Sequence, residues 1–252
     1  AETRYSLAHR HGALAVGELL QHEPSNLGIL VGEWGEPPAD FRRFVFFDTE
    51  TTGLAGGTGT YAFLVGLGTF EGDEFVIRQY FMRDLPEEPA MLSLVREVLE
   101  PGAGLVSFNG RTFDWPLLET RFAMNRQPVP RVDGCHLDLL LPARRLWRLR
   151  LESCALSSLE ERVLGLQRSS DDVPGWAIPG LYRDYLVWGR AKPLRRVFYH
   201  NAHDVLSLVT LAALLCASLR EPLQTLTHGE DLFSLGRRFE AEGDVDAAAV
   251  LY

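Results

Sequence analysis

The chain has 252 residues, of which 46% are hydrophobic, and its formal net charge is −9 at pH 7. This length suits one large α/β domain with additions, and the chain contains no uninterrupted apolar stretch of about 20 residues that would predict a membrane span. The negative charge argues against a protein that coats nucleic acid nonspecifically, because such binding requires a strongly basic surface.

The predicted strands and helices follow an order typical of a mixed sheet. Residues 1–43 hold short mixed elements, and we expect them to form an extension that packs on the core. Apolar runs then predict strands at 44–48, 61–69, 74–82 and 104–108, with a short one near 132–137. A helix is predicted at 89–100, and the first three strands would form an antiparallel meander. The predicted class is α/β, a mixed sheet flanked by helices.

The first of these strands ends in two carboxylates. Asp48 and Glu50 follow the apolar run 44–47 and come just before a turn at Gly53. Because they are two residues apart on a strand, both side chains point to one face. Two like charges this close repel each other unless a cation neutralises them. A divalent metal site explains the pair, and a solvated strand end explains it only if no other carboxylates join.

Two further acidic residues follow, one at the start of a predicted helix and one within a predicted helix. Asp114 comes after the strand 104–108, at the start of a predicted helix, where a helix cap is the simpler reading if it is taken alone. Asp204 lies in a predicted helix four residues after His200, so both side chains share one helix face. An exposed helix face with His and Asp is common, so this pair gains meaning only from the whole set.

The whole set resembles the DEDD (DnaQ-like) superfamily of 3′→5′ exonucleases. Its three motifs are matched by Phe-Asp-Thr-Glu-Thr-Thr-Gly at 47–53, Asn-Gly-Arg-Thr-Phe-Asp at 109–114 and His-Asn-Ala-His-Asp-Val at 200–205. From Tyr5 to about Leu215 the chain resembles more closely the YprB-type RNase H-like exonuclease family. The resemblance implies an RNase H-like α/β fold with a nuclease domain at 44–220, and phosphodiester hydrolysis with two divalent ions, Mg²⁺ or Mn²⁺.

The same resemblance implies a division of labour among the four acids. Asp48 would bridge the two ions, which lie about 4 Å apart in such sites. Glu50 and Asp204 would complete the ligands of one ion, and Asp114 would act mainly on the second. Carboxylates suit this role because hard cations prefer oxygen ligands.

The general base departs from the family pattern. One branch has His five residues before the last Asp and the other has Tyr four before it, whereas this chain has Tyr199 at five and His200 at four. Histidine is the better base near neutral pH, since its ordinary pKa is about 6.5 and that of tyrosine about 10. Helix geometry also places His200 closer to the face of Asp204, while His203 points about 100° away. We therefore predict His200 as the base, with Tyr199 as the alternative.

Weaker signals concern the substrate. Backbone N–H groups of the first motif could bind the terminal nucleotide, namely those of Thr51, Thr52 and Gly53. Asn109 and Thr112 could touch a phosphate, although Asn-Gly is also a common turn. Asp138 could support the metal ligands or the substrate indirectly, and a structural hydrogen-bonding role fits it equally well.

Two basic clusters could bind phosphates or could be solvated helix faces. They comprise Arg144, Arg145, Arg148 and Arg150 in the first, and Arg190, Lys192, Arg195 and Arg196 in the second. Trp147 within the first cluster could stack on a base or anchor packing.

The last residues, 221–252, resemble the start of a tetratricopeptide (TPR) hairpin that is truncated here. Such a tail predicts a protein partner, for which a helicase or another repair protein is the candidate. The chain has three cysteines and none in a Cys-x-x-Cys pair, and there is no signal-peptide pattern, so we expect free thiols and a cytoplasmic location.

The predicted function is 3′→5′ hydrolysis of DNA, on single strands or 3′ ends, in repair. Two alternatives stay open at this point: the same chemistry on RNA, and a noncatalytic scaffold that binds nucleic acid or protein. No residue can be assigned to a 2′-OH contact, which is what would separate RNA from DNA.

Overall fold

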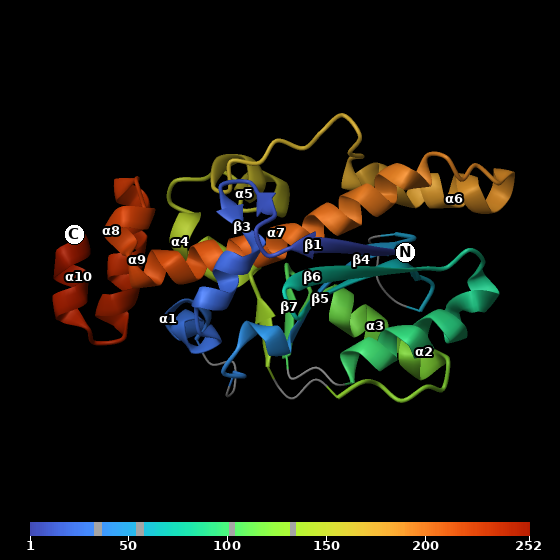
Figure 1. Cartoon of the computed structure of the whole chain (residues 1–252), viewed down its shortest axis with the longest axis horizontal. Coiled ribbons are helices and arrows are strands. Elements are labelled where there is room, and N and C mark those ends of the chain that lie inside the picture. The colour runs from blue at the N-terminus through green and yellow to red at the C-terminus, as the bar shows by residue number, and fades with distance from the viewer. Residues whose placement is uncertain (33–36, 54–57, 101–103, 132–134) are drawn as a thin grey trace.

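The computed structural model describes residues 1–32, 37–53, 58–100, 104–131 and 135–252, and these ranges contain a six-stranded sheet (Figure 1). The strand order is β1-β6-β5-β4-β7-β8. The bounds are Glu2–Ser6 (β1), Phe44–Thr51 (β4), Ala62–Glu71 (β5), Glu74–Phe81 (β6), Gly104–Ser107 (β7) and His136–Asp138 (β8). A separate small pair is formed by Arg10–His11 (β2) and Leu14–Ala15 (β3).

The sheet is mixed, as predicted. Strands β4, β5 and β6 form the antiparallel meander, whereas β7 pairs with β4 and with β8 in parallel. The N-terminal segment does more than pack on the core, because β1 pairs antiparallel with β6 and forms one edge of the main sheet. The domain limits at 43/44 and 220/221 stay predictions. Since β4 continues to Thr51, both carboxylates of the first motif belong to a strand in the middle of the sheet.

Side chains of β4 alternate between two apolar cores. Phe46 belongs to the core on one face of the sheet, and Val45 and Phe47 belong to the core on the other. A strand buried on both faces reads as a continuous apolar run, which is why it is visible in the sequence.

Helices cover both faces of the sheet (Figure 1). One face packs against α2 and α3, and the other against the long α7, which runs along most of the molecule. The helix bounds are Gly28–Val31 (α1), Glu88–Leu99 (α2), Asp114–Met124 (α3), Leu140–Trp147 (α4), Leu156–Arg162 (α5), Ile178–Trp188 (α6), Leu194–Arg220 (α7), Pro222–Thr225 (α8), Gly229–Ala241 (α9) and Val245–Leu251 (α10). Short 3₁₀ turns occur at Val16–Gln21, Pro24–Leu27, Phe41–Arg43, Leu85–Glu87 and Gly175–Ala177.

Helix α7 is long and apolar enough to cross a membrane by length and composition alone. However, 72% of its most apolar window is buried inside the protein. Residues such as Val205 and Leu208 are completely or almost completely buried in the core between α7 and the sheet. This burial is what the core helix of a globular domain shows, so α7 is weak evidence for a membrane span.

The C-terminal segment is helical, as predicted. Helices α9 and α10 lie side by side at one end of the molecule (Figure 1), joined by a turn in which Gly243 has a φ of +87° and Asp244 caps α10. Asp231 of α9 pairs at 2.9 Å with Arg150, which follows α4, so the tail is docked on the domain. The resemblance of this hairpin to a TPR unit, and a partner bound through it, stay predictions.

Candidate active site

Two of the four acids project from β4 toward α7. Asp48 and Glu50 share the face of Phe46, which packs in the core that includes α7. The carboxylate of Asp48 accepts a hydrogen bond from Asn201 Nδ2 at 2.9 Å. Asn201 can come this close because residue 66 of β5 is glycine: a Cβ there would lie 2.3 Å from Asn201 Oδ1.

Glu50 has less support from its neighbours. Its side chain is buried, and within the described ranges its Oε1 atom has no hydrogen-bond partner. A buried carboxylate oxygen without a partner costs about 1–3 kcal/mol or more. Such an atom is therefore a candidate ligand of a cation.

Asp114 reaches the site from the other side of β4. It is the first residue of α3, and the N-cap position is occupied by Phe113, so the reading of Asp114 as the helix cap is wrong. Its carboxylate instead accepts a hydrogen bond from the hydroxyl of Thr49, the strand residue between Asp48 and Glu50. This contact ties the start of α3 to the acidic end of β4.

His200 and Asp204 share one face of α7, as their spacing predicted. His200 Nε2 lies 3.6 Å from Asp204 Oδ2. Tyr199 is 37% exposed and its ring packs near that of His203, which in turn faces Glu160. Of the three candidate bases, His200 is therefore the one directed at Asp204.

The structure also contains a network of ion pairs around Arg168, a residue that no pattern in the sequence indicated. Arg168 lies in the loop after α5 and forms ion pairs with Glu160 at 2.6 Å, Asp172 at 3.2 Å and Asp204 at 2.5 Å. Asp172 Oδ1 also lies 2.8 Å from Nδ1 of His200. Arg168 and Asp172 lie in an irregular loop, which has no period that would predict their approach to α7 from the sequence.

Burial makes the acidic cluster electrostatically costly. Desolvation, and then the charges of Asp204 and Asp114, raise the pKa of Asp48 well above its ordinary value. Desolvation followed by the charge of Asp48 does the same to the pKa of Glu50. The pKa of Asp114 rises to about 6, mainly through desolvation.

Asp204 differs from these three acids because the guanidinium group of Arg168 pairs with its carboxylate. Its pKa is raised by desolvation, against which the nearby His200 and Arg168 act. For Asp48 and Glu50, no direct ion pair occurs in the part of the chain that the structure describes. Among the residues that the structure describes, Asp204 is therefore neutralised by an ion pair, and Asp48 and Glu50 are not.

The residues present fit hard divalent ions. The four side chains offer only oxygen donors, which Mg²⁺ and Mn²⁺ prefer, and one of these oxygens is buried without a partner. Within the described ranges, no three acidic, histidine or cysteine side chains already surround one point as the ligands of an ion. Arg168 and Asn201 hold two of the acids in their present positions.

The predicted substrate-binding threonines are partly engaged in the turn after β4. The Thr52 N–H donates to the carbonyl of Tyr61 at 2.9 Å, so this N–H is not free for a nucleotide. The Thr51 hydroxyl donates to the carbonyl of Gly53 at 2.9 Å. Both contacts shape the turn that leads away from the acids.

Asn109 and Asp138 together build the turn before α3. Asn109 has a φ of +62°, in the left-handed region that asparagine tolerates, and accepts a hydrogen bond from the Thr112 hydroxyl at 2.9 Å. Asp138 accepts hydrogen bonds from the N–H groups of Asn109 at 2.7 Å, Arg111 at 3.2 Å and Leu140 at 3.1 Å. Asp138 thus positions the loop that carries Asp114, which fits the structural role considered for it.

The first basic cluster does not form one surface. Arg145 donates to the carbonyl of Leu30 at 2.6 Å, and Arg150 pairs with Asp231. Trp147 is only 1% exposed, so the packing role is confirmed and the stacking role is wrong. The other two arginines, Arg144 and Arg148, are exposed.

Comparison with known proteins is consistent with this architecture. A family model described as the RNase_H superfamily matches residues 45–216. The uncharacterized protein YprB of Bacillus subtilis (strain 168) is 32% identical over 253 residues, covering 98% of this chain and 60% of that protein. The chain thus spans about 60% of the length of this relative.

Similar solved structures include two proteins of greater length. One is the family B DNA polymerase from Pyrobaculum calidifontis, with a TM-score of 0.47 and 19% identity over 83% of this chain and 30% of that chain. Another is E. coli exonuclease I in complex with a dT13 oligonucleotide, with a TM-score of 0.47 and 15% identity over 79% of this chain and 45% of that chain.

Proposed function

The chain belongs to the RNase H superfamily, and on this premise we propose that it is a metal-dependent 3′→5′ exonuclease that hydrolyses phosphodiester bonds by a two-metal-ion mechanism. The observation that supports this proposal most is the cluster of four carboxyl groups from β4, α3 and α7, close enough for their charges to act on one another. Glu50 and Asp114 are buried, and Asp48 and Asp204 are half-buried. A cluster of this kind destabilises a fold that has no use for it. It therefore argues against a noncatalytic scaffold.

The four carboxyl groups would hold two divalent ions, Mg²⁺ or Mn²⁺. Such ions activate the attacking water and stabilise the leaving oxygen when they are bound. Within the chain, Thr49 and Asn201 orient Asp114 and Asp48 by hydrogen bonds, so these carboxylates keep their direction when the ligand set is completed.

His200 is proposed as the general base and Asp172 as the residue that orients it. Nδ1 of His200 lies 2.8 Å from Asp172 Oδ1 and 2.9 Å from Arg168 Nη1. In the proposed tautomer Nδ1 donates its proton to Asp172, so Nε2 carries the lone pair and faces Asp204. Although burial acts in the opposite direction, the hydrogen bond and charge of His200 and the charge of Arg168 hold the pKa of Asp172 below its ordinary value. Asp172 is therefore an ionised acceptor at neutral pH and leaves Nε2 free to take a proton from water.

The proposed substrate is the 3′ end of DNA, in repair. DNA is preferred to RNA on the resemblance of the three motifs to the YprB-type family, and RNA is the second candidate. A location in the cytoplasm and a protein partner at the helical tail belong to the same proposal.

A nuclease assay tests the reaction. Wild type and Asp48→Asn are incubated with DNA and RNA of matched sequence, labelled at the 3′ or 5′ end, in Mg²⁺, Mn²⁺ or EDTA. We expect stepwise loss of nucleotides from the 3′ end, abolished by EDTA and by the substitution. The absence of metal-dependent cleavage on every substrate would refute the proposal.

A second assay tests the role of Asp172. General base catalysis contributes about 10²–10⁴-fold, so His200→Ala should lower kcat within this range. Asp172→Asn should lower kcat by less and leave KM nearly unchanged, and Asp172→Glu should restore part of the loss. If Asp172→Asn altered KM alone, Asp172 would contact the substrate and would not orient the base.

A further inference from the structure

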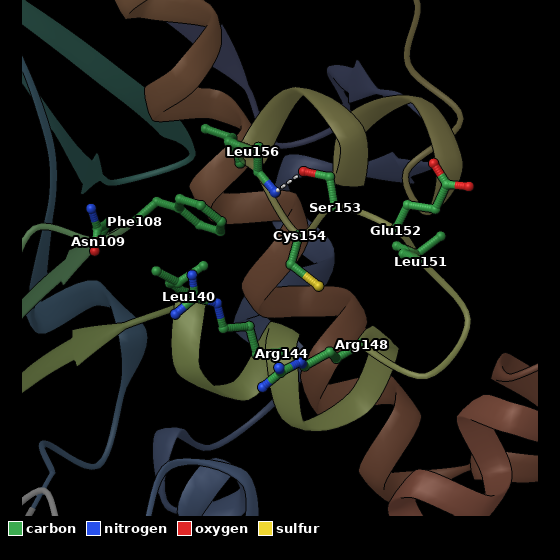
Figure 2. A pocket seen from close by; sticks show the side chains of 11 residues that line it. Phe108, Asn109, Leu140, Arg144, Arg148, Leu151, Glu152, Ser153, Cys154 and Leu156 are labelled. Carbon is green, nitrogen blue, oxygen red and sulfur yellow. Dashed lines mark hydrogen bonds between the residues drawn. The ribbon is translucent and has the colours of Figure 1, made fainter.

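A pocket of about 760 Å³ opens between the end of β7, helix α4 and the start of α5 (Figure 2). Phe108 and Asn109 line it from the end of β7, with the ring of Phe108 directed toward the loop that carries Cys154. Arg144 and Arg148 line it from α4, and Leu156 from α5. The volume lies in the range of ligand sites, about 300–1,000 Å³. A cavity of this size suits a short stretch of single strand better than a duplex.

On both sides of this pocket, lining segments are connected to the acidic residues of the site. On one side, Asn109 opens the turn that ends at Asp114. On the other, α5 starts at the pocket and carries Glu160, which pairs with Arg168, the partner of Asp204. Because β7 pairs in parallel with β4 and Val106 lies opposite Phe46, Phe108 leaves the sheet at the level of Asp48. A polymer whose end lies among the acids therefore has this pocket beside it.

The pocket carries positive charge that the fold does not use. Arg144 lies in α4 and Arg148, four residues later, ends it with helical backbone angles, so their side chains lie on one helix face. Both are exposed, and in the described ranges neither guanidinium has an ion pair or hydrogen bond, in contrast to the engaged Arg145 and Arg150. The acidic lining residue Glu152 points its carboxylate away from these two groups (Figure 2).

We propose that this pocket binds the sugar–phosphate backbone of a single-stranded nucleic acid, upstream of the 3′ end that lies at the acids. Arg144 and Arg148 bind its phosphates, because neighbouring guanidinium groups are suited to bidentate phosphate contacts. The apolar surface of Phe108 and Leu156 packs against sugars or bases. This inference rests on the proposed function. It specifies where the substrate lies upstream of its 3′ end, and that this part of the substrate is single-stranded.

The test is equilibrium binding of a 5′-fluorescein oligothymidylate in EDTA, measured by anisotropy over a series of salt concentrations. The test variant is Arg144→Gln/Arg148→Gln. The matched control is Arg126→Gln/Arg131→Gln, which removes the same charge from exposed positions after the C-terminal end of α3, outside both basic clusters. Loss of two phosphate contacts to a single strand should lower the slope of log K against log[salt] by about 1.4 and weaken binding at least tenfold. The control should keep the wild-type slope.

Three outcomes would overturn the inference: no oligothymidylate binding by wild type, equal losses in the two double variants, or a loss in the control alone. Equal thermal unfolding midpoints of all three proteins exclude a folding defect, which is expected because the four substituted side chains are exposed.

A small substrate separates this inference from the proposed function. The p-nitrophenyl ester of thymidine 5′-monophosphate has a phosphodiester but no upstream nucleotides. Arg144→Gln/Arg148→Gln should hydrolyse it at the wild-type rate while KM for oligothymidylate rises, and a reduced rate on the small ester would contradict the upstream position. If wild type hydrolysed neither substrate but the pocket variant still lost binding in EDTA, the proposed function would fail and the binding site would stand.

Discussion

Replacing Asp114 by Asn should make the metal-free protein progressively more stable than wild type as the pH rises from about 4 to about 7. Burial raises the pKa of Asp114 to about 6 from its ordinary value of 3.8. The folded protein therefore binds a proton at Asp114 over a pH range in which the unfolded chain has released it. In this range the free energy of unfolding of wild type falls as the pH rises.

The size of the effect follows from the same interval. Each unit of difference between the two pKa values corresponds to 1.36 kcal/mol. The rise from 3.8 to about 6 therefore lowers the free energy of unfolding of wild type by roughly 3 kcal/mol. Asn at this position keeps the oxygen that accepts the hydrogen bond of Thr49 but cannot ionise. The free energy of unfolding of the variant therefore does not fall with pH in this way. Its difference from wild type levels off above about pH 7.

Urea denaturation in EDTA, at pH steps between 4.5 and 8, measures this difference. Asp73→Asn, in the exposed turn between β5 and β6, controls for the change in net charge. A difference between Asp114→Asn and wild type that stayed constant over this range would refute the reasoning, because it would mean that the carboxyl of Asp114 is solvated in the folded protein. Adding Mg²⁺ should reduce the advantage of the variant, since a bound cation favours the ionised carboxylate.

Three further predictions concern the supports of the site. Glu88→Ala should lower the free energy of unfolding by about 3–5 kcal/mol, because it leaves Arg121 of α3 buried without the partner that lies 2.5 Å away; urea denaturation measures this loss. Gly66→Ala should cost about 1–3 kcal/mol by pushing Asn201 away from the acids, and calorimetry should show a lower unfolding temperature. Mg²⁺ or Mn²⁺ at about 100 times its Kd should stabilise wild type by about 2.7 kcal/mol but should not stabilise Asp48→Asn to this extent in a thermal shift assay.

Each of these has a matched control. Glu87→Ala breaks the pair with Arg83, which is 74% exposed, and should change stability little. Gly180→Ala adds a Cβ inside α6 where no atom lies within 4 Å, so it should leave stability unchanged or raise it by up to about 1 kcal/mol. A loss in a control as large as in its test variant, or equal stabilisation of wild type and Asp48→Asn by metal, would contradict the corresponding prediction.

The local pattern of residues in the sequence was sufficient to predict most of the strands and helices that carry the site. The apolar run before Asp48, the helix at 89–100 and the shared face of His200 and Asp204 were all predicted, and the structure has each of them. These features depend on residue spacings of two, three or four, which strands and helices impose on any chain. The mixed sheet and its meander followed from the order of the same elements.

The role of β1 as an edge strand was not predictable in the same way. Its residues, Glu2–Ser6, are mostly polar and exposed, so they carry no apolar alternation. The strand forms because β6 offers an unpaired edge, which exists only once the meander has folded.

The sequence by itself determined which acids are present, on which elements they lie and which way their side chains alternate, because these properties depend on neighbours in the chain. The tertiary structure decided which charges meet: Arg168 reaches Asp204 and Asp172 reaches His200 through an irregular loop without a period. It also decided that the acids are buried or half-buried, and that Arg144 and Arg148 line a pocket without an ion partner among the described residues. Desolvation and long-range ion pairs depend on distances between segments far apart in the sequence, and only packing sets those distances.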